Sequence, residues 1–284
     1  MIQDIYPKKL NNSYKTEAVP KDDSLIVIHD NGKLLLKIDK DKCEISFPRF
    51  KNFKDKDIKT IYLFDVSGEE FFYALDVDLS INQLTSTYDF FTMKQLREYY
   101  LNPKHYVFAS YTAIQLIEWY EANRFCGKCG NKNDLSKTER ALVCPNCGNV
   151  RYPRINPAVI VGVRNKDSLL LTKYRTGFGH NALVAGFTEI GETVEETVAR
   201  EVMEETGLKV KNITYYKSQP WGIASDILLG FYCDVDGDDK IRMDETELKY
   251  AQWVKRDEIE LQPLEYSLTN EMMMKFKENN PIIS

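Results

Sequence analysis

The chain has 284 residues, of which 43% are hydrophobic, and a formal net charge of -5. This length predicts two domains plus a small module, and the apolar fraction is sufficient for packed cores. The negative net charge argues against a protein that binds nucleic acid mainly through the phosphates of the backbone, although it allows a local basic groove. The N-terminal MIQDIYPKKL lacks an apolar run, and no stretch approaches the roughly 18 apolar residues of a spanning helix. We therefore expect a cytoplasmic protein with no signal peptide and no membrane partner.

Residues 1–122 are predicted to form a strand-rich N-terminal domain. Apolar runs separated by Asp, Asn and Gly turns predict strands at Leu25–His29, Leu34–Ile38, Ile61–Phe64 and Phe71–Leu75. Apolar residues at roughly helical spacing predict helices at about Met93–Tyr99 and Tyr111–Asn123. This half of the chain has no motif that indicates its function.

Residues 123–152 carry two tight cysteine pairs, Cys126/Cys129 and Cys144/Cys147. Each CxxC pair presents two thiolates from one turn, and the glycine after the second cysteine permits the positive φ of such a turn. Two such turns brought together form the tetrahedral sulfur site that zinc prefers, with no coordination position left open. We therefore expect a structural Zn²⁺. Nucleic-acid binding by this module is the alternative, with positive charge from Lys128, Lys132, Lys137, Arg140 and Arg151.

Residues 153–284 are predicted to form an α/β (α+β) sandwich with a mixed sheet. Strands are expected at Ala158–Val163, Leu169–Lys173, Ala182–Ala185, Ile213–Ser218, Ile227–Asp234 and Tyr250–Val254. Helices are expected at about Val194–Thr206 and Glu265–Lys277. Thr193 is predicted to cap the first of these helices and Gly207 to end it.

The helix at Val194–Thr206 has a pattern typical of a metal site. Glu201, Glu204 and Glu205 are three and four residues apart, so they are predicted to project from one face. Stacked like charges repel, and a hard divalent cation such as Mg²⁺ or Mn²⁺ removes that cost. A solvated glutamate-rich helix is the simpler alternative. The apolar residues expected on the opposite face are Val194, Val198 and Val202.

Residues 186–208, which read GFTEIGETVEETVAREVMEETGL, resemble the Nudix box at every specified position. The matching residues are Gly186, Glu192, Arg200, Glu201, Val202, Glu204, Glu205, Gly207 and Leu208. The resemblance implies a Nudix α/β/α sandwich that hydrolyses a diphosphate with metal-activated water. It implies that Glu201, Glu204 and Glu205 bind Mg²⁺ or Mn²⁺ and are catalytic together with Arg200, which would contact Glu192. Which glutamate activates the water stays open.

A second segment resembles the NADH pyrophosphatase branch of this family. Residues 218–221, Ser-Gln-Pro-Trp, match the start of its SQPWPFPxS segment, whereas residues 222–226 depart from the remainder. The order of an N-terminal domain, a zinc ribbon and a Nudix domain is also similar to that branch. The resemblance implies Glu247 as a further metal ligand. The nucleotide contacts that it implies are Gln219, Phe187, Tyr152 and Ala251, and packing roles are the alternative for the two aromatic residues.

This branch implies a homodimer that hydrolyses NADH or NAD⁺ to nicotinamide mononucleotide and AMP, and that also acts on the 5′ end of NAD-capped RNA. The altered residues 222–226 motivate an alternative, a Nudix diphosphatase for ADP-ribose, dinucleoside polyphosphates or nucleotide sugars. A non-enzymatic nucleotide-sensing regulator is the second alternative. An unbroken box argues against the regulator, because such a protein does not need the catalytic residues.

Overall fold

The computed structural model describes residues 1–53, 58–75, 77, 84, 86–176 and 179–278. The chain divides into two compact units. One unit contains residues 2–154 and 222–224, and the other contains Met1, residues 155–221 and residues 225–284. None of the helices in the described ranges combines the length and the hydropathy needed to cross a bilayer.

The unit of residues 2–154 contains the strands predicted for the N-terminal domain. One sheet has the order β1-β6-β7-β2, and the other joins β3, β4 and β5, with β8 against β4. The strands are β1 (Leu10–Asn11), β2 (Leu25–Val27), β3 (His29–Asp30), β4 (Lys33–Asp39), β5 (Glu44–Ser46), β6 (Lys59–Val66), β7 (Glu69–Leu75) and β8 (Asp89–Thr92), with a 3-10 turn η1 (Phe50–Phe53). The strands β1, β5 and β8 were not predicted.

The helices of this unit differ from the prediction. At Met93–Tyr99 only a 3-10 turn forms, η2 (Gln95–Arg97), and Leu96 is its one buried residue. Met93 and Leu96 are both buried, but the backbone between Met93 and Tyr99 forms no α-helix, so the prediction was wrong. The second predicted helix is present, but α1 (Lys104–Ala122) begins directly after Pro103. Its first turns are buried on most sides, which hides the apolar periodicity that marks a helix in a sequence.

The second unit is built on a mixed sheet, as predicted. Its strand order is β15-β16-β12-β13-β17, with β14 also paired to β12. Strands β12 and β16 are parallel, whereas the other pairs are antiparallel. The elements are β12 (Asn156–Asn165), β13 (Ser168–Tyr174), β14 (Val184–Phe187), α2 (Val194–Thr206), β15 (Val210–Trp221), β16 (Asp226–Val235), β17 (Leu248–Lys255), η3 (Arg256–Glu258) and α3 (Leu268–Lys277).

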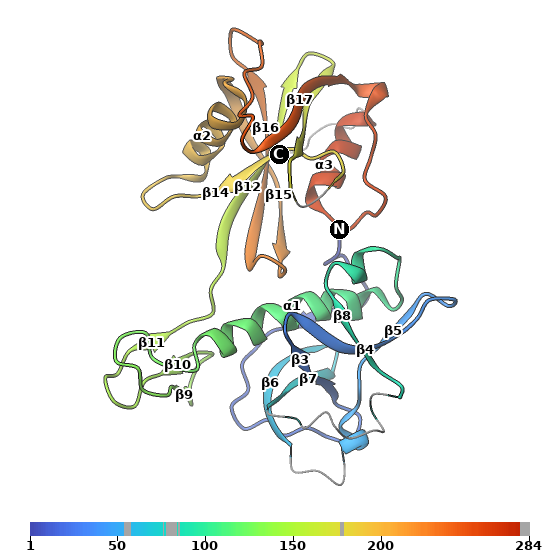
Figure 1. Ribbon diagram of the computed structural model, residues 1–284, viewed down its shortest axis with the longest axis vertical. Helices are drawn as coiled ribbons and strands as arrows, with labels where there is room; N and C mark the ends of the chain where they lie inside the picture. The colour runs from blue at the N-terminus through green and yellow to red at the C-terminus, as the bar shows by residue number, and fades with distance from the viewer. Residues whose placement is uncertain (54–57, 76, 78–83, 85, 177–178, 279–284) are drawn as a thin grey trace. The chain divides into compact units, whose positions relative to one another are not determined.

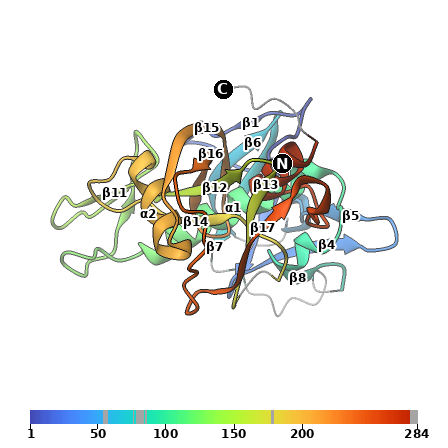
Figure 2. The same ribbon diagram turned by 90° about the horizontal axis from the view of Figure 1, so that it is seen from above.

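Alternating side chains of β12 form a core on each face of this sheet. On one face Val161 packs in a cluster with Val198 of α2. On the other face Ile160 packs in a cluster with Met272 of α3. Figures 1 and 2 show α2 and α3 separated by the strands. The predicted α/β/α sandwich is thus confirmed.

The ends of α2 lie where the sequence predicted them. The Thr193 hydroxyl accepts a hydrogen bond from the Glu196 backbone at 3.2 Å, and the Glu196 carboxylate accepts from the Thr193 backbone at 2.7 Å. Gly207 ends the helix with a φ of 68°. Helix α3 begins later than predicted, at Leu268, because Ser267 caps its first turn.

Candidate active site

The three glutamates of α2 lie at different depths. Glu205 follows Val198 by seven residues and Val202 by three, so it lies on the apolar side of the helix and is 2% exposed. The side chain of Glu204 is 60% exposed and that of Glu201 is 13% exposed. The prediction that all three project from one face, opposite the valines, is therefore wrong for Glu205.

Arg200 joins the loop before α2 to two of these glutamates. Its Nε and Nη2 atoms donate to the two carboxylate oxygens of Glu192 at 2.6 and 3.0 Å, which is the predicted contact. Nη2 also donates to the backbone oxygen of Phe187 at 2.8 Å. Nη1 donates to Glu201 Oε1 at 2.7 Å and to Glu204 Oε2 at 2.9 Å. The hydrogen bonds from Arg200 lower the pKa of Glu192 to about 2.

Gly186 is required by the close approach of Glu201. A Cβ atom at residue 186 would lie 1.9 Å from Glu201 Cδ and 2.1 and 2.2 Å from its carboxylate oxygens. Gly186 lies in β14, which is held in register by β12. Because Gly186 has no side chain, the Glu201 carboxylate can pack directly against β14.

Glu205 has one bonded and one unbonded carboxylate oxygen. The Tyr174 hydroxyl donates to Oε1 at 3.0 Å. Oε2 is buried and has no hydrogen-bond partner in the described part of the chain. Burial, with added repulsion from Glu201 and Glu247, raises the pKa of Glu205 to about 8 despite hydrogen bonds from the Tyr174 hydroxyl and the Ala185 backbone. Sequence reasoning missed Tyr174, whose one signal was its place directly after a predicted strand.

The loop before β17 brings Glu247 toward α2. Within this loop the backbone N–H of Asp244 donates to the backbone oxygen of Glu205 at 2.8 Å. Glu247 itself is exposed. Its negative charge contributes to raising the pKa values of both Glu201 and Glu205, although burial is the largest cause for each. The structure thus groups Glu247 with the carboxylates of the box.

These carboxylates fit a hard divalent cation. Glu205 Oε2 is a buried oxygen that lacks a partner among the described residues, whereas one oxygen each of Glu201 and Glu204 is paired with Arg200, which leaves the other oxygen of each for a cation. No three carboxylates of the described residues place one oxygen each within 4.8 Å of one another. Mg²⁺ commonly retains several waters, which can bridge it to carboxylates that it does not touch.

The four cysteines of the predicted zinc site come together. Their Sγ atoms all lie within 4.8 Å of one another, with 3.6 Å between Cys126 and Cys147 and 3.4 Å between Cys129 and Cys144. Each turn closes through the following glycine, Gly130 at a φ of 76° and Gly148 at 68°. The sheet of this module has the order β11-β10-β9, with β9 (Asp134–Leu135), β10 (Leu142–Val143) and β11 (Val150–Arg151). This is the geometry of a closed, structural zinc site.

Three of the predicted nucleotide contacts have surface available. Phe187 is 52% exposed at the end of β14, and Tyr152 is 58% exposed. The Tyr152 hydroxyl donates to Glu139 at 3.1 Å. Ala251 is half-buried in β17.

Gln219 is different, because it is fully buried in β15. Its Nε2 donates to the backbone oxygen of Tyr266 at 2.8 Å, and its Oε1 accepts from the Leu268 backbone at 2.7 Å. Both ends of the amide therefore hold the start of α3. The contact of Gln219 with a nucleotide stays a prediction.

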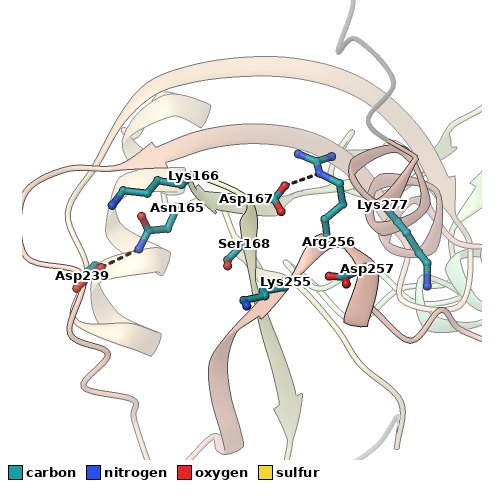
Figure 3. A pocket seen from close by; sticks show the side chains of 9 residues that line it. All are labelled: Asn165, Lys166, Asp167, Ser168, Asp239, Lys255, Arg256, Asp257 and Lys277. Carbon is teal, nitrogen blue, oxygen red and sulfur yellow. Dashed lines mark hydrogen bonds and ion pairs between the residues drawn. The ribbon is translucent and has the colours of Figure 1, made fainter.

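A large cavity of about 840 Å³ lies elsewhere in this unit, at the turn between β12 and β13. Figure 3 shows Arg256 turned toward Asp167, with which it forms an ion pair, and Asn165 turned toward Asp239. No residue of the 186–208 segment lines it. The carboxylate cluster, and not this cavity, is therefore the candidate active site.

Comparison with protein families identifies two segments of the chain. Residues 154–275 match the NUDIX domain, and this range contains α2 together with Glu192, Glu201, Glu204, Glu205 and Glu247. The chain carries a NUDIX domain. Residues 121–152 match the NADH pyrophosphatase zinc ribbon domain, so the four cysteines form the zinc site of that ribbon.

Several relatives match about half of the chain. The chain is 46% identical over 151 residues to a protein of Enterobacter sp. (strain 638) named NAD-capped RNA hydrolase NudC. It is also 46% identical over 154 residues to the protein of that name from Klebsiella pneumoniae (strain 342). Each match covers 53% of this chain and 58% of the relative. A solved NUDIX hydrolase from Nitrosomonas europaea superposes on 55% of the chain and 92% of that structure, with 21% identity and a TM-score of 0.49.

Proposed function

We propose that this protein is a metal-dependent hydrolase that cleaves the diphosphate bond of NADH or NAD⁺. The products are nicotinamide mononucleotide and AMP, and the same bond is cleaved at the 5′ end of NAD-capped RNA. The observation that carries the proposal is the buried oxygen of Glu205, which has no partner among the described residues and lies in a NUDIX domain beside Glu201 and Glu247.

Glu201, Glu204, Glu205 and Glu247 would hold Mg²⁺ or Mn²⁺ in this site. The bound ion would neutralise the charge of the diphosphate and lower the pKa of water. Arg200 fixes the geometry, since its one guanidinium bonds the loop through Glu192 and the helix through Glu201. The glutamates are the groups able to accept a proton from the attacking water, and they share that task as a coupled set.

Three observations support a dinucleotide substrate. The zinc ribbon is of the NADH pyrophosphatase type, the Ser-Gln-Pro-Trp segment is present, and the relatives are named for hydrolysis of NAD-capped RNA. We assign Phe187, Tyr152 and Ala251 to nucleotide contact, because they retain exposed surface. Gln219 enters the proposal as a residue that holds the segment before α3.

A second candidate is a diphosphatase for ADP-ribose, dinucleoside polyphosphates or nucleotide sugars. Residues 222–226 favour it, since they lack the two prolines and the phenylalanine of the family segment. At the end of this stretch Asp226 is buried and accepts a hydrogen bond from Asn156 at 3.3 Å. That contact gives Asp226 a structural role at the start of β16.

Product analysis by chromatography separates these candidates. Wild type and Glu205→Gln would be incubated with NADH, NAD⁺, ADP-ribose or diadenosine polyphosphates in Mg²⁺ or Mn²⁺. The proposal expects nicotinamide mononucleotide and AMP, formed fastest from NADH or NAD⁺ and lost in the variant. Faster cleavage of ADP-ribose would favour the second candidate. Turnover unaffected by Glu205→Gln, or no turnover at all, would reject the catalytic site.

The proposal includes a homodimer, which the family resemblance alone supports. Light scattering at micromolar concentration should give twice the chain mass of 33.0 kDa. A mass of one chain at that concentration would contradict it.

A further inference from the structure

We infer that Tyr174 is a positioning residue of the metal site, which holds Glu205 Oε1 so that Oε2 alone is presented to the cation. This inference rests on the proposed function for its chemistry. Its evidence is the contact between strand and helix around Glu205, which no motif of the sequence marks.

Tyr174 reaches Glu205 from the sheet. Within β13, residues 170, 172 and 174 alternate with residues 169 and 171, and Leu170 lies in the core on the α2 face. The same alternation places Tyr174 on the α2 face, at the end of the strand. A register irregularity lies between Lys173 and Tyr174, where β13 pairs with β17. Beyond this irregularity Tyr174 lies opposite Leu248 of β17, and its hydroxyl reaches Glu205 of α2 at 3.0 Å.

The Tyr174 hydroxyl has one proton and two nearby acceptors. Glu205 Oε1 lies at 3.0 Å, whereas the backbone oxygen of Ala185 lies at 3.5 Å. The shorter contact to a carboxylate is the stronger bond. Ala185 precedes Gly186, which leaves space for the Glu201 carboxylate. The Tyr174 hydroxyl therefore lies close to the strand residues that contact both Glu201 and Glu205.

A carboxylate with neither oxygen bonded can rotate and bind a cation through either or both oxygens. The bond from Tyr174 removes that freedom for Oε1, while Oε2 stays buried and unpaired among the described residues. Partners of this kind, which orient a metal ligand, typically contribute about 10-fold to 100-fold to metal affinity. Tyr174 thus acts through Glu205 and needs no contact with the substrate.

Tyr174→Phe keeps the ring and removes the hydroxyl. Mn²⁺ binding, measured by electron paramagnetic resonance of the free ion, should weaken about 10-fold to 100-fold. The kcat at saturating Mn²⁺ should fall, with the KM for NADH unchanged. Tyr250→Phe is the matched control in the same domain, because its hydroxyl donates to Asn181 at 3.5 Å and not to one of the glutamates of the site. The control should leave Mn²⁺ binding and kcat at wild-type values.

A double-mutant cycle separates positioning from general damage to the fold. If Tyr174 acts only through Glu205, then Tyr174→Phe should not weaken Mn²⁺ binding further in the Glu205→Gln background. The same loss in both backgrounds, or wild-type Mn²⁺ binding by Tyr174→Phe, would overturn the inference. Wild-type protein that binds Mn²⁺ but hydrolyses none of the nucleotides would reject the proposed function, and the binding cycle would still test Tyr174.

Discussion

Replacing Glu205 by Gln should stabilise the NUDIX domain in buffer freed of Mg²⁺ and Mn²⁺. Burial raises the pKa of Glu205 from its usual 4.5 to about 8. Between these values the folded domain holds the proton while the unfolded chain releases it, so folding must take up a proton. This cost is absent below pH 4.5, grows as the pH rises and levels off above pH 8. The glutamate therefore lowers stability most at alkaline pH.

The magnitude follows from the shift. One pKa unit corresponds to about 1.4 kcal/mol, so the full cost above pH 8 is at most about 5 kcal/mol. At pH 5.5 the same reasoning gives only about 1 kcal/mol. Glutamine has no charge to bury, and its Oε1 can still accept the hydrogen bond from Tyr174. We expect Glu205→Gln to exceed wild type by about 2–4 kcal/mol at pH 8, and by much less at pH 5.5.

Hydrogen exchange of β12 peptides with increasing urea measures the free energy of unfolding of this domain by itself. Glu204→Gln is the matched control on the same helix, because that side chain is 60% exposed and should show little pH-dependent gain. Saturating Mn²⁺ should make wild type more stable than Glu205→Gln, since a ligand stabilises the folded form that binds it. A Glu205→Gln domain no more stable than wild type at pH 8, or a gain equal at both pH values, would refute this account of Glu205.

Three further predictions concern the remaining supports of the site. Gly186→Ala should lower the domain's free energy of unfolding by about 1–3 kcal/mol and weaken Mn²⁺ binding, because the new Cβ occupies the space of the Glu201 carboxylate. Unchanged Mn²⁺ binding would show that β14 shifts to accommodate the Cβ. Arg200→Lys should lower kcat on the order of 100-fold, since an ammonium cannot bond Glu192 and the glutamates of α2 at once. A variant with the wild-type kcat would contradict this role of Arg200. Cys144→Ser should remove zinc, measured by elemental analysis, and lower the melting temperature by at least about 5 °C; an unchanged melting temperature would rule out a structural role.

The sequence by itself determined the features that depend on near neighbours in the chain. The capping box at Thr193 and the left-handed Gly207 fixed both ends of α2, because caps involve residues within one turn. The cysteine turns followed from CxxC spacing, for the same reason. Central strands of the second unit, such as Ala158–Val163, were found from short continuous apolar runs, since both faces of its sheet are covered. The helix predicted at Met93–Tyr99 failed because two buried apolar residues three positions apart suit a single 3-10 turn as well as an α-helix.

Only the tertiary structure decided how the glutamates differ. Their spacing on α2 is symmetrical enough to suggest one face, but the sheet covers the side that contains Glu205. The Tyr174 contact joins residues 31 positions apart, and the amide of Gln219 is held by residues 47 and 49 positions away. Such pairs form when strands and helices pack, so no local pattern encodes them. The depth of each carboxylate, and with it the pKa of Glu205, is therefore a property of the assembled sandwich.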